Sequence, residues 1–289
     1  MTEVADVLRR IVARRREVVA EFGGVGGELA ERSGALGVAE NDFLAALDRR
    51  RSSAVIAEVK MGSPRIGSLA GRVDPVAQAR MYAANGAAAL SVVVEPEFFS
   101  GSYELLSQCR EASGLPAIAK DFVIAPVQLV WARDAGASAV LLIAALYERE
   151  ELWRLAGLAR GLGLAPLVET HDEADRWLLD GASWELVGVN NRDLRTFAVD
   201  LERSKALAPR LPAGALRVAE SGIGSAGDVA GLRSAGFDAF LVGEALLLAD
   251  DPAAKLRELT GSPPQPLDPL PTRAPHPKGV VGGRGRPRP

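Results

Sequence analysis

Eight short apolar runs, each followed by a polar turn and a helical segment, constrain this chain of 289 residues more than any other feature. They occupy residues 54–59, 88–94, 116–120, 139–144, 164–169, 185–190, 216–220 and 238–243. Their apolarity is continuous rather than alternating, which indicates strands buried on both faces and paired in parallel under helices. Eight such units over roughly 200 residues favour an α/β fold of the (β/α)8 TIM barrel type over a doubly wound open sheet.

The segments between the runs have the composition and spacing of helices. We expect helices at 74–84, 103–112, 126–135, 148–160, 172–179, 201–207, 226–235 and 252–259. Several are followed by a glycine that suits the left-handed position after a helix, namely Gly86, Gly114, Gly136, Gly161, Gly181 and Gly236.

An N-terminal helical extension precedes the first run. Residues 4–21 have apolar positions at helical spacing, and we interpret Arg14, Arg15 and Arg16 as a solvated face. A glycine-rich break at 23–27 leads to a second helix, 42–49, with Asn41 as its N-cap. We therefore divide the chain into a helical extension (1–50), a barrel (51–260) and a tail (261–289).

The tail differs sharply in composition, since it holds nine of the chain's 18 prolines and several basic residues. Without apolar periodicity it cannot bury enough surface to offset its ordering entropy, so we predict a passive disordered tail.

Composition excludes several classes of function. No apolar run approaches the ~18 residues that span a bilayer, and acids and arginines stand where a secretory signal has its apolar core, so we expect a cytoplasmic protein. Cys109 is the only cysteine, and His171 and His276 are the only histidines, which argues against a disulfide or a metal cluster. With a net charge of -3 and no evident sticky surface, we expect a monomer that binds no nucleic acid and no membrane.

Ionisable and polar residues stand where the apolar runs stop, and in a parallel barrel these strand ends form the active site. They are Glu58, Lys60, Glu95, Lys120, Asp121, Glu169, Asn190, Arg192, Glu220, Ser221, Gly243 and Glu244. Two lysines facing several carboxylates can shift pKa values and act as general acids and bases. A single residue of this kind can be incidental, but its recurrence at several strand ends predicts an enzyme site.

Glycine turns after the seventh and eighth runs give a second signal. Ser221, Gly222 and Gly224 stand just before a helix, and Gly243 ends the eighth run. Main-chain amides in such turns bind phosphate, and in barrels this site follows strands 7 and 8. Ser63, after the first run, offers a further hydroxyl.

The segments IAEVKMGSPRIG, FFSGS, IAKDFVI, LVETHDE, VGVNNRDLRTF, VAESGI and LVGEALL occur in this order, after a helix containing IVARRREVV. Together they resemble the motifs of the indole-3-glycerol phosphate synthase family over nearly everything but the tail. The resemblance implies decarboxylating ring closure of 1-(2-carboxyphenylamino)-1-deoxyribulose 5-phosphate, a phosphosugar, in tryptophan synthesis. It implies no metal and no organic cofactor.

The resemblance also implies a role for each matching residue. Lys120 would be the general acid, Glu169 the glutamate of the dehydration step, and Lys60 the lysine near the substrate carboxylate. Glu58 and Asn190 would orient Lys120 and the sugar hydroxyls. The other implied positions are Arg192 and Glu220 in the same site, and Ser63, Ser221, Gly222, Gly243 and Glu244 around the phosphate. Phe99 and Phe122 are candidates to pack on the anthranilate ring, with ordinary packing as the alternative.

The chain departs from the family pattern at four positions. The family usually has lysine at Met61, a basic residue at Ile66, and threonine followed by aspartate at Val94 and Glu95. The missing basic groups would weaken the electrostatic attraction of the substrate, or they would indicate that the chain acts on a different substrate.

Two alternatives remain at this stage. A phosphoribosylanthranilate isomerase acts on a related phosphosugar, but it needs a cysteine early in the barrel, whereas Cys109 falls in a helix before the third run. A catalytically silent phosphate-binding barrel that serves as an assembly module would be expected to have lost Lys120 or Glu169, and both are present.

Overall fold

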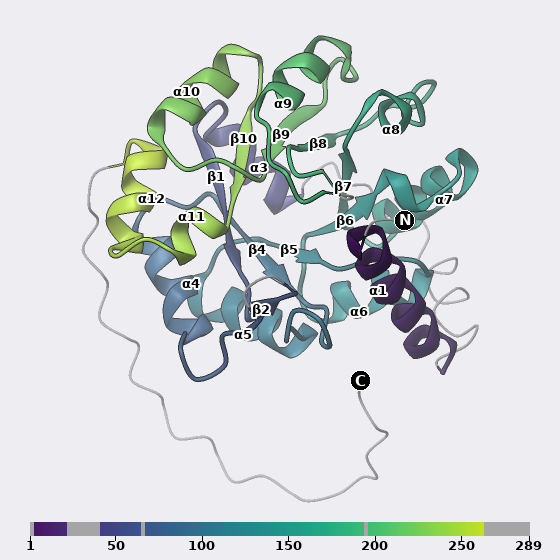
Figure 1. Cartoon of the computed structure of the whole chain (residues 1–289), viewed down its shortest axis with the longest axis horizontal. Helices are drawn as coiled ribbons and strands as arrows, with labels where there is room; N and C mark the ends of the chain where they lie inside the picture. The colour runs from purple at the N-terminus through teal and green to yellow at the C-terminus, as the bar shows by residue number, and fades with distance from the viewer. Residues whose placement is uncertain (1–2, 22–40, 65–66, 194–195, 263–289) are drawn as a thin grey trace, which may run out of the picture.

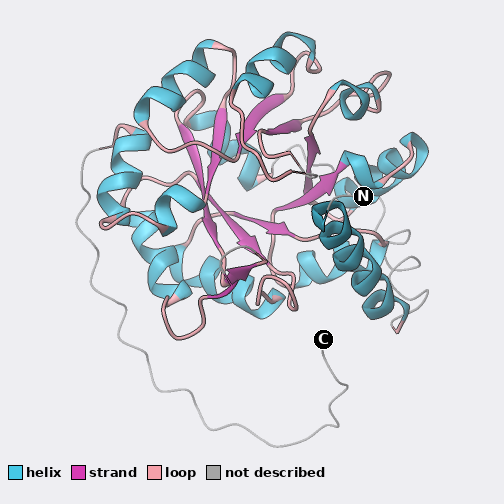
Figure 2. Ribbon diagram, viewed as in Figure 1, coloured by secondary structure: helices cyan, strands magenta, loops and turns pink. Residues whose placement is uncertain are grey.

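The eight apolar runs form a closed parallel barrel (Figures 1 and 2). The computed structural model describes residues 3–21, 41–64, 67–193 and 196–262. The barrel strands are β1 (Ala54–Val59), β4 (Ala89–Val93), β5 (Ala117–Lys120), β6 (Ala139–Ile143), β7 (Ala165–Thr170), β8 (Leu186–Asn190), β9 (Leu216–Glu220) and β10 (Ala239–Val242). Because β1 pairs with both β4 and β10, the sheet has no free edge. The predicted (β/α)8 barrel is confirmed, and the open sheet is excluded.

Helices surround the barrel in the intervals where the sequence predicts them. They are α4 (Pro75–Ala84), α5 (Tyr103–Ser113), α6 (Pro126–Asp134), α7 (Arg149–Gly161), α8 (Glu173–Trp177), α9 (Glu202–Leu207), α10 (Ala226–Ser234) and α12 (Pro252–Thr260), with the short α11 (Glu244–Leu247) after β10. The expectation that Gly161 follows its helix is wrong. Helix α7 includes Gly161, and Gly163 takes the left-handed conformation instead, with φ of 76°.

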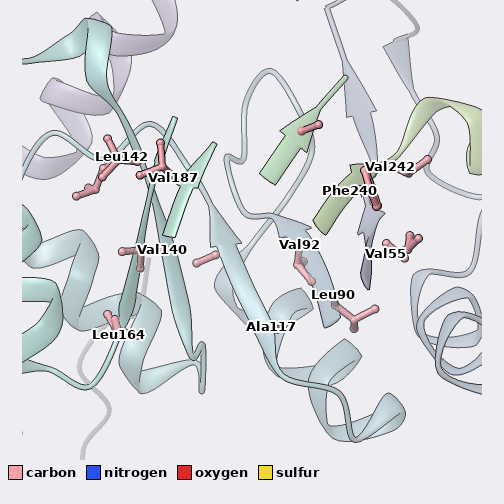
Figure 3. Packing of buried hydrophobic residues seen from close by; sticks show 14 of the residues in the cluster. Val55, Leu90, Val92, Ala117, Val140, Leu142, Leu164, Val187, Phe240 and Val242 are labelled. Atoms are coloured by element: carbon pink, nitrogen blue, oxygen red, sulfur yellow. The ribbon is translucent and has the colours of Figure 1, made fainter. Parts of the chain in front are cut away.

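Side chains from alternate strand positions enter two different apolar layers. In β1, Val55, Ala57 and Val59 point into the layer beneath the helices, whereas Ala54 and Ile56 point into the barrel interior. Figure 3 shows part of the outer layer, including Leu90 and Val92 on β4, Val55 on β1, and Phe240 and Val242 on β10. Strand β1 lies between the other two and pairs with both. Burial on both faces explains why each run is continuously apolar.

Helix α3 (Asp42–Arg49) closes the amino-terminal end of the barrel. Its Phe43 and Leu47 are fully buried against the interior layer. The predicted N-cap is confirmed, since Asn41 Oδ1 accepts the main-chain N–H groups of Phe43 and Leu44 at 3.0 and 3.1 Å. Asn41 Nδ2 also donates to the carbonyls of Ser138 and Gly163 at 2.7 and 2.9 Å, which ties the start of α3 to two barrel connections.

Helix α1 (Glu3–Ala20) lies at the opposite end, nearest the viewer in Figure 1 while α3 is on the far side. The prediction of a solvated arginine face is wrong for Arg15. Its side chain is only 3% exposed and donates to the buried carboxylate of Asp121, directly after β5. The Arg14 side chain is 42% exposed and pairs with Glu17 and Glu97. Helix α1 is therefore docked to the barrel by a buried ion pair.

The connection after β1 contains a small hairpin of β2 (Gly62–Ser63) and β3 (Gly67–Ser68). Met61 is half-buried against the outer apolar layer. Ile66, the 23–27 break and residues 263–289 of the tail lie outside the described residues, so the domain boundaries stay predictions. No helix in the described part of the chain is long and apolar enough to cross a membrane.

We expect Asn41→Ala to lower the free energy of unfolding by about 2 kcal/mol, because it removes a helix cap and two partly buried hydrogen bonds. Asn41→Ser keeps a cap acceptor and loses only the bonds to Ser138 and Gly163, so its loss should be smaller. Urea unfolding measures both. Equal stability of Asn41→Ser and the wild type would show that the two bonds contribute nothing.

Candidate active site

A cavity of about 680 Å³ opens at the carboxyl ends of the barrel strands. The strand-end residue Glu95 does not line it, whereas every residue to which the family resemblance gave a role does: Glu58, Lys60, Ser63, Phe99, Lys120, Phe122, Glu169, Asn190, Arg192, Glu220, Ser221, Gly222, Gly243 and Glu244. They come from segments as far apart in the chain as Glu58 and Glu244, and they meet because parallel strands bring their ends to one rim.

Lys120, at the end of β5, is the centre of the charged part of this cavity. Its Nζ lies 2.9 Å from Glu220 Oε2 and 3.6 Å from Glu169 Oε2. The two carboxylates are 1% and 3% exposed, whereas the lysine side chain is 20% exposed and reaches the cavity. One cation thus contacts two buried carboxyl groups, and its own charge faces the space where a ligand would lie.

The electrostatic consequences differ for the three groups. Burial opposes the charged form of Lys120, but Glu220, Glu169 and Glu58 outweigh it and raise its pKa above the ordinary range. Burial likewise opposes ionisation of Glu169, yet Lys120 and His171 lower its pKa to about 2. For Glu220, burial and the neighbouring Glu169 prevail over Lys120 and raise its pKa to about 7. The lysine is therefore held protonated, and one of the carboxyls can carry a proton at neutral pH.

A second ion pair lies beside the first. Lys60 Nζ is 3.0 Å from Glu58 Oε1, at the end of β1. Burial would raise the pKa of Glu58, but Lys60 and Lys120 lower it. Asn190 hydrogen-bonds Glu169 through its side chain, and its Oδ1 accepts the main-chain N–H of Arg192 at 3.0 Å. Asn190 thus orients the carboxylate that faces Lys120.

Two glycines make room for the buried carboxylates. A methyl group on Gly188 would lie 2.2 Å from Glu220 Oε1, and one on Gly243 would lie 2.5 Å from Glu58 Oε1. Both contacts are far inside van der Waals distance. Gly188 therefore leaves the space that the Glu220 carboxylate occupies on the neighbouring strand, a function that the sequence alone does not reveal.

The other wall of the cavity is apolar. Phe99 and Phe122 both line it, with ring centroids 6.1 Å apart. Glu95, one of the departures from the family pattern, is buried and accepts the main-chain N–H groups of Glu97, Phe98 and Phe99 at 2.7 to 3.1 Å. The glutamate therefore fixes the loop that presents Phe99.

The predicted phosphate region is a pair of turns. Ser221 and Gly222 both have left-handed backbones, with φ of 66° and 79°. The amide of Gly224 donates to Asp228 within the cap of α10, so it is engaged by the protein itself. Glu244 Oε2 pairs with Arg192 Nη2 at 3.0 Å. Because a carboxylate repels phosphate, only the main-chain N–H of Glu244 suits the predicted role.

Sequence reasoning missed two contributions to the site. Val7, Leu8 and Ile11 of α1 line the cavity, so the extension supplies one wall of it. The apolar stripe of residues 4–21 was the available signal, since such a stripe must be covered by something. Asp121, which the sequence does place at a strand end, accepts hydrogen bonds from the Arg15 guanidinium, the Tyr103 hydroxyl at 2.9 Å and Gln128 Nε2 at 3.1 Å.

His171 is the second omission. It follows β7 and is 6% exposed, with its two ring nitrogens facing Glu169 and Asp175. Its position two residues after the strand-end Glu169 was the available signal. Among the described residues, no group of three or more His, Cys, Asp or Glu side chains is arranged to hold a metal ion.

The family model that matches this chain and its similar relatives have the same name. The family model described as indole-3-glycerol phosphate synthase matches residues 8–259. The indole-3-glycerol phosphate synthase of Acidithiobacillus ferrooxidans is 40% identical over 270 residues, covering 89% of this chain and 99% of that protein. The enzyme of the same name from Roseiflexus castenholzii is 49% identical over 230 residues, covering 76% of this chain and 85% of that one.

A solved structure, the thiamine phosphate pyrophosphorylase of Pyrococcus furiosus, superposes with a TM-score of 0.53 at 16% identity and covers 74% of this chain and 96% of that one. At this identity the similarity concerns the fold alone.

We expect Gly188→Ala to lower the free energy of unfolding by about 2 kcal/mol, because the added methyl group overpacks against Glu220. In a Glu220→Ala background the clash is absent, so the same substitution should cost much less. Urea unfolding of the two single variants and the double variant measures the coupling between the positions. A cost for Gly188→Ala that is the same in both backgrounds would contradict the assigned contact.

Proposed function

The chain belongs to the indole-3-glycerol phosphate synthase family, and on that premise we propose that its cavity catalyses the decarboxylating ring closure of 1-(2-carboxyphenylamino)-1-deoxyribulose 5-phosphate to indole-3-glycerol phosphate, carbon dioxide and water. The observation that carries the proposal is Lys120, held protonated between Glu169 and Glu220 at the floor of a cavity with one charged and one aromatic wall. In the reaction a ring carbon attacks the sugar carbonyl, whose oxygen must gain a proton.

Lys120 is the proposed donor of that proton. Its neighbours raise its pKa in the free protein, so the ammonium form predominates at neutral pH and a proton is available. The sequence suggested that neighbouring charges would tune the lysine, and here they raise its pKa rather than lowering it towards neutrality. Transfer to the oxyanion that forms in the transition state is favourable because an alkoxide is far more basic than an amine.

Glu169 is the proposed base of the dehydration step. With Lys120 charged, the pKa of Glu169 is about 2 and the carboxylate is a weak base. When Lys120 gives up its proton, the largest favourable Coulomb interaction of Glu169 is lost, and its pKa rises. Protonation of the carbonyl oxygen by the acid therefore prepares the base for the next step. Carbon dioxide is lost after ring closure, and in the dehydration Glu169 accepts the proton that the five-membered ring loses. The hydroxyl leaves as water with a proton from a protonated group of the site, and the proton held by Glu169 then replaces the one that was given up.

The rest of the cavity suits the remaining parts of the substrate. Lys60 can pair with the carboxylate that leaves as carbon dioxide, and Phe99 and Phe122 can pack on the anthranilate ring. Main-chain amides of the Gly222 and Gly243 turns, with the hydroxyls of Ser63 and Ser221, can bind the phosphate. Arg192 supplies a positive charge next to these turns.

The two alternatives receive no support from the geometry. Cys109 is fully buried in α5, where burial raises the pKa of its thiol to about 12, and it is not among the residues that line the cavity. A silent barrel has no need of two buried carboxylates on one lysine, which are costly to assemble. A cytoplasmic location and a monomeric state stay predictions from the sequence.

We expect the purified protein to convert the carboxyphenylamino-deoxyribulose phosphate to an indole product, followed by indole fluorescence. Lys120→Met should reduce kcat by at least ~10³-fold, since it removes the proton donor. Binding of inorganic phosphate, measured by calorimetry, should stay within about twofold of the wild type because the glycine turns are untouched.

The matched control is Lys205→Met, which removes an exposed lysine on α9 that pairs with Glu202. Its turnover should equal that of the wild type. Absence of product with the wild-type protein across pH 6 to 9 would refute the activity, and an active Lys120→Met would refute the assignment of the acid.

We expect Glu244→Gln to tighten phosphate binding about threefold, because it removes a carboxylate next to the proposed phosphate site and frees Arg192. Arg192→Met should weaken binding. The same calorimetric titration measures both, and unchanged affinity in both variants would place the phosphate elsewhere.

A further inference from the structure

His171 lies in an unusual charge environment just behind the proposed base. Its Nε2 is 3.2 Å from Glu169 Oε1, and its Nδ1 is 3.2 Å from Asp175 Oδ2. All three side chains are nearly buried, with exposed fractions of 3% to 11%. Together with Lys120 they form a row of alternating charge that runs from the cavity, through β7, to α8: lysine, glutamate, histidine, aspartate.

The geometry decides the protonation state of the ring. Asp175 Oδ2 accepts both the main-chain N–H of His171 at 2.8 Å and the Nδ1 side of the ring, so the Nδ1 proton is fixed. In a neutral ring the Nε2 lone pair would then face the Glu169 carboxylate, which is repulsive. A proton on both nitrogens removes the repulsion and makes both contacts attractive.

The remaining charged groups around His171 do not cancel this effect. Arg203 on α9 donates to the His171 carbonyl at 3.1 Å and also contacts Asp193 Oδ2 at 3.3 Å. That cation faces the main chain and is itself paired. Burial opposes a charged ring, but the carboxylates of Asp175 and Glu169 outweigh it and raise the pKa of His171 to about 10.

We propose that His171 is a positioning residue for catalysis, a permanently protonated imidazolium that holds Oε1 of Glu169 so that Oε2 faces Lys120 and the cavity. Asp175 holds the imidazolium in turn. This inference rests on the proposed function of Glu169 as the base.

The role follows from what happens after Lys120 loses its proton. Glu169 then has no cation on its Oε2 side, and a carboxylate left beside Glu220 would be repelled from its place. The His171 contact does not change during the reaction, so the carboxylate stays aimed at the substrate. In the free protein, His171 Nε2 and Glu169 Oε1 lie 3.2 Å apart but are not aligned as a hydrogen bond, and Nε2 is buried without a hydrogen-bond partner among the described residues. A small rotation of the carboxylate aligns it.

The charge of His171 can be measured without any turnover. The chain contains only two histidines, and His276 lies outside the described residues, so a His276→Gln variant labelled with 15N-histidine gives one set of ring signals. We expect both ring nitrogens to report the protonated state from pH 6 to 8.5. A titration near the ordinary pKa of about 6.5 would overturn the proposal.

Kinetics then test the positioning role. His171→Phe removes both the charge and the donor, and we expect kcat to fall about tenfold with KM changed less than threefold. Loss of the neighbouring cation raises the pKa of Glu169, so the acidic limb of the kcat profile should move about one unit to higher pH. His171→Gln keeps a donor without charge and should recover part of kcat.

A merely structural role predicts something different. It would lower the activity of both variants through stability, with a pH profile parallel to that of the wild type and no recovery by glutamine. That pattern would overturn the positioning role. If no variant and no wild-type sample forms product, the proposed function fails, whereas the NMR result still shows whether the imidazolium exists.

Discussion

The charge balance around Lys120 is the interaction on which the rest of the site depends. Buried carboxylates are stable only when paired, and Glu169 and Glu220 share this one lysine within 3.6 Å. The two carboxyl groups respond to this shared cation in opposite directions. The pKa of Glu169 falls to about 2, and the pKa of Glu220 rises to about 7. A proton that leaves Lys120 therefore changes the state of every neighbour, which is a useful property in an acid–base site.

The scaffold supports this balance at two distances from the cavity. Close to it, Gly188 and Gly243 leave the space that the Glu220 and Glu58 carboxylates occupy. Further away, the buried pair of Arg15 and Asp121 fixes α1 beside the end of β5, one residue from Lys120. The same helix provides an apolar wall of the cavity. The N-terminal extension is thus continuous with the site.

The site residues could be predicted because a parallel barrel converts a sequence pattern into a location. Once eight apolar runs are recognised, the residue at which each run stops is known to reach the same rim, so Glu58, Lys120, Glu169 and Glu220 could be chosen without coordinates. The departure at Glu95 also becomes intelligible, since its carboxylate reaches three main-chain amides of the loop before α5. Arg15 was misjudged because its neighbours in the sequence are exposed, and only docking of α1 shows which arginine points inward.

The sequence by itself determined the eight-unit barrel, the end of the barrel that carries the chemistry, and the residue types available there, because apolar periodicity and strand ends are local properties of a chain. Only the tertiary structure decided which charges are paired. Distances between separate strands and helices decide whether Lys120 pairs with one carboxylate or two. They also decide whether Gly188 leaves room for Glu220 and whether His171 contacts Glu169. Electrostatic energies change steeply over a few ångströms, and that scale is fixed by packing rather than by sequence order.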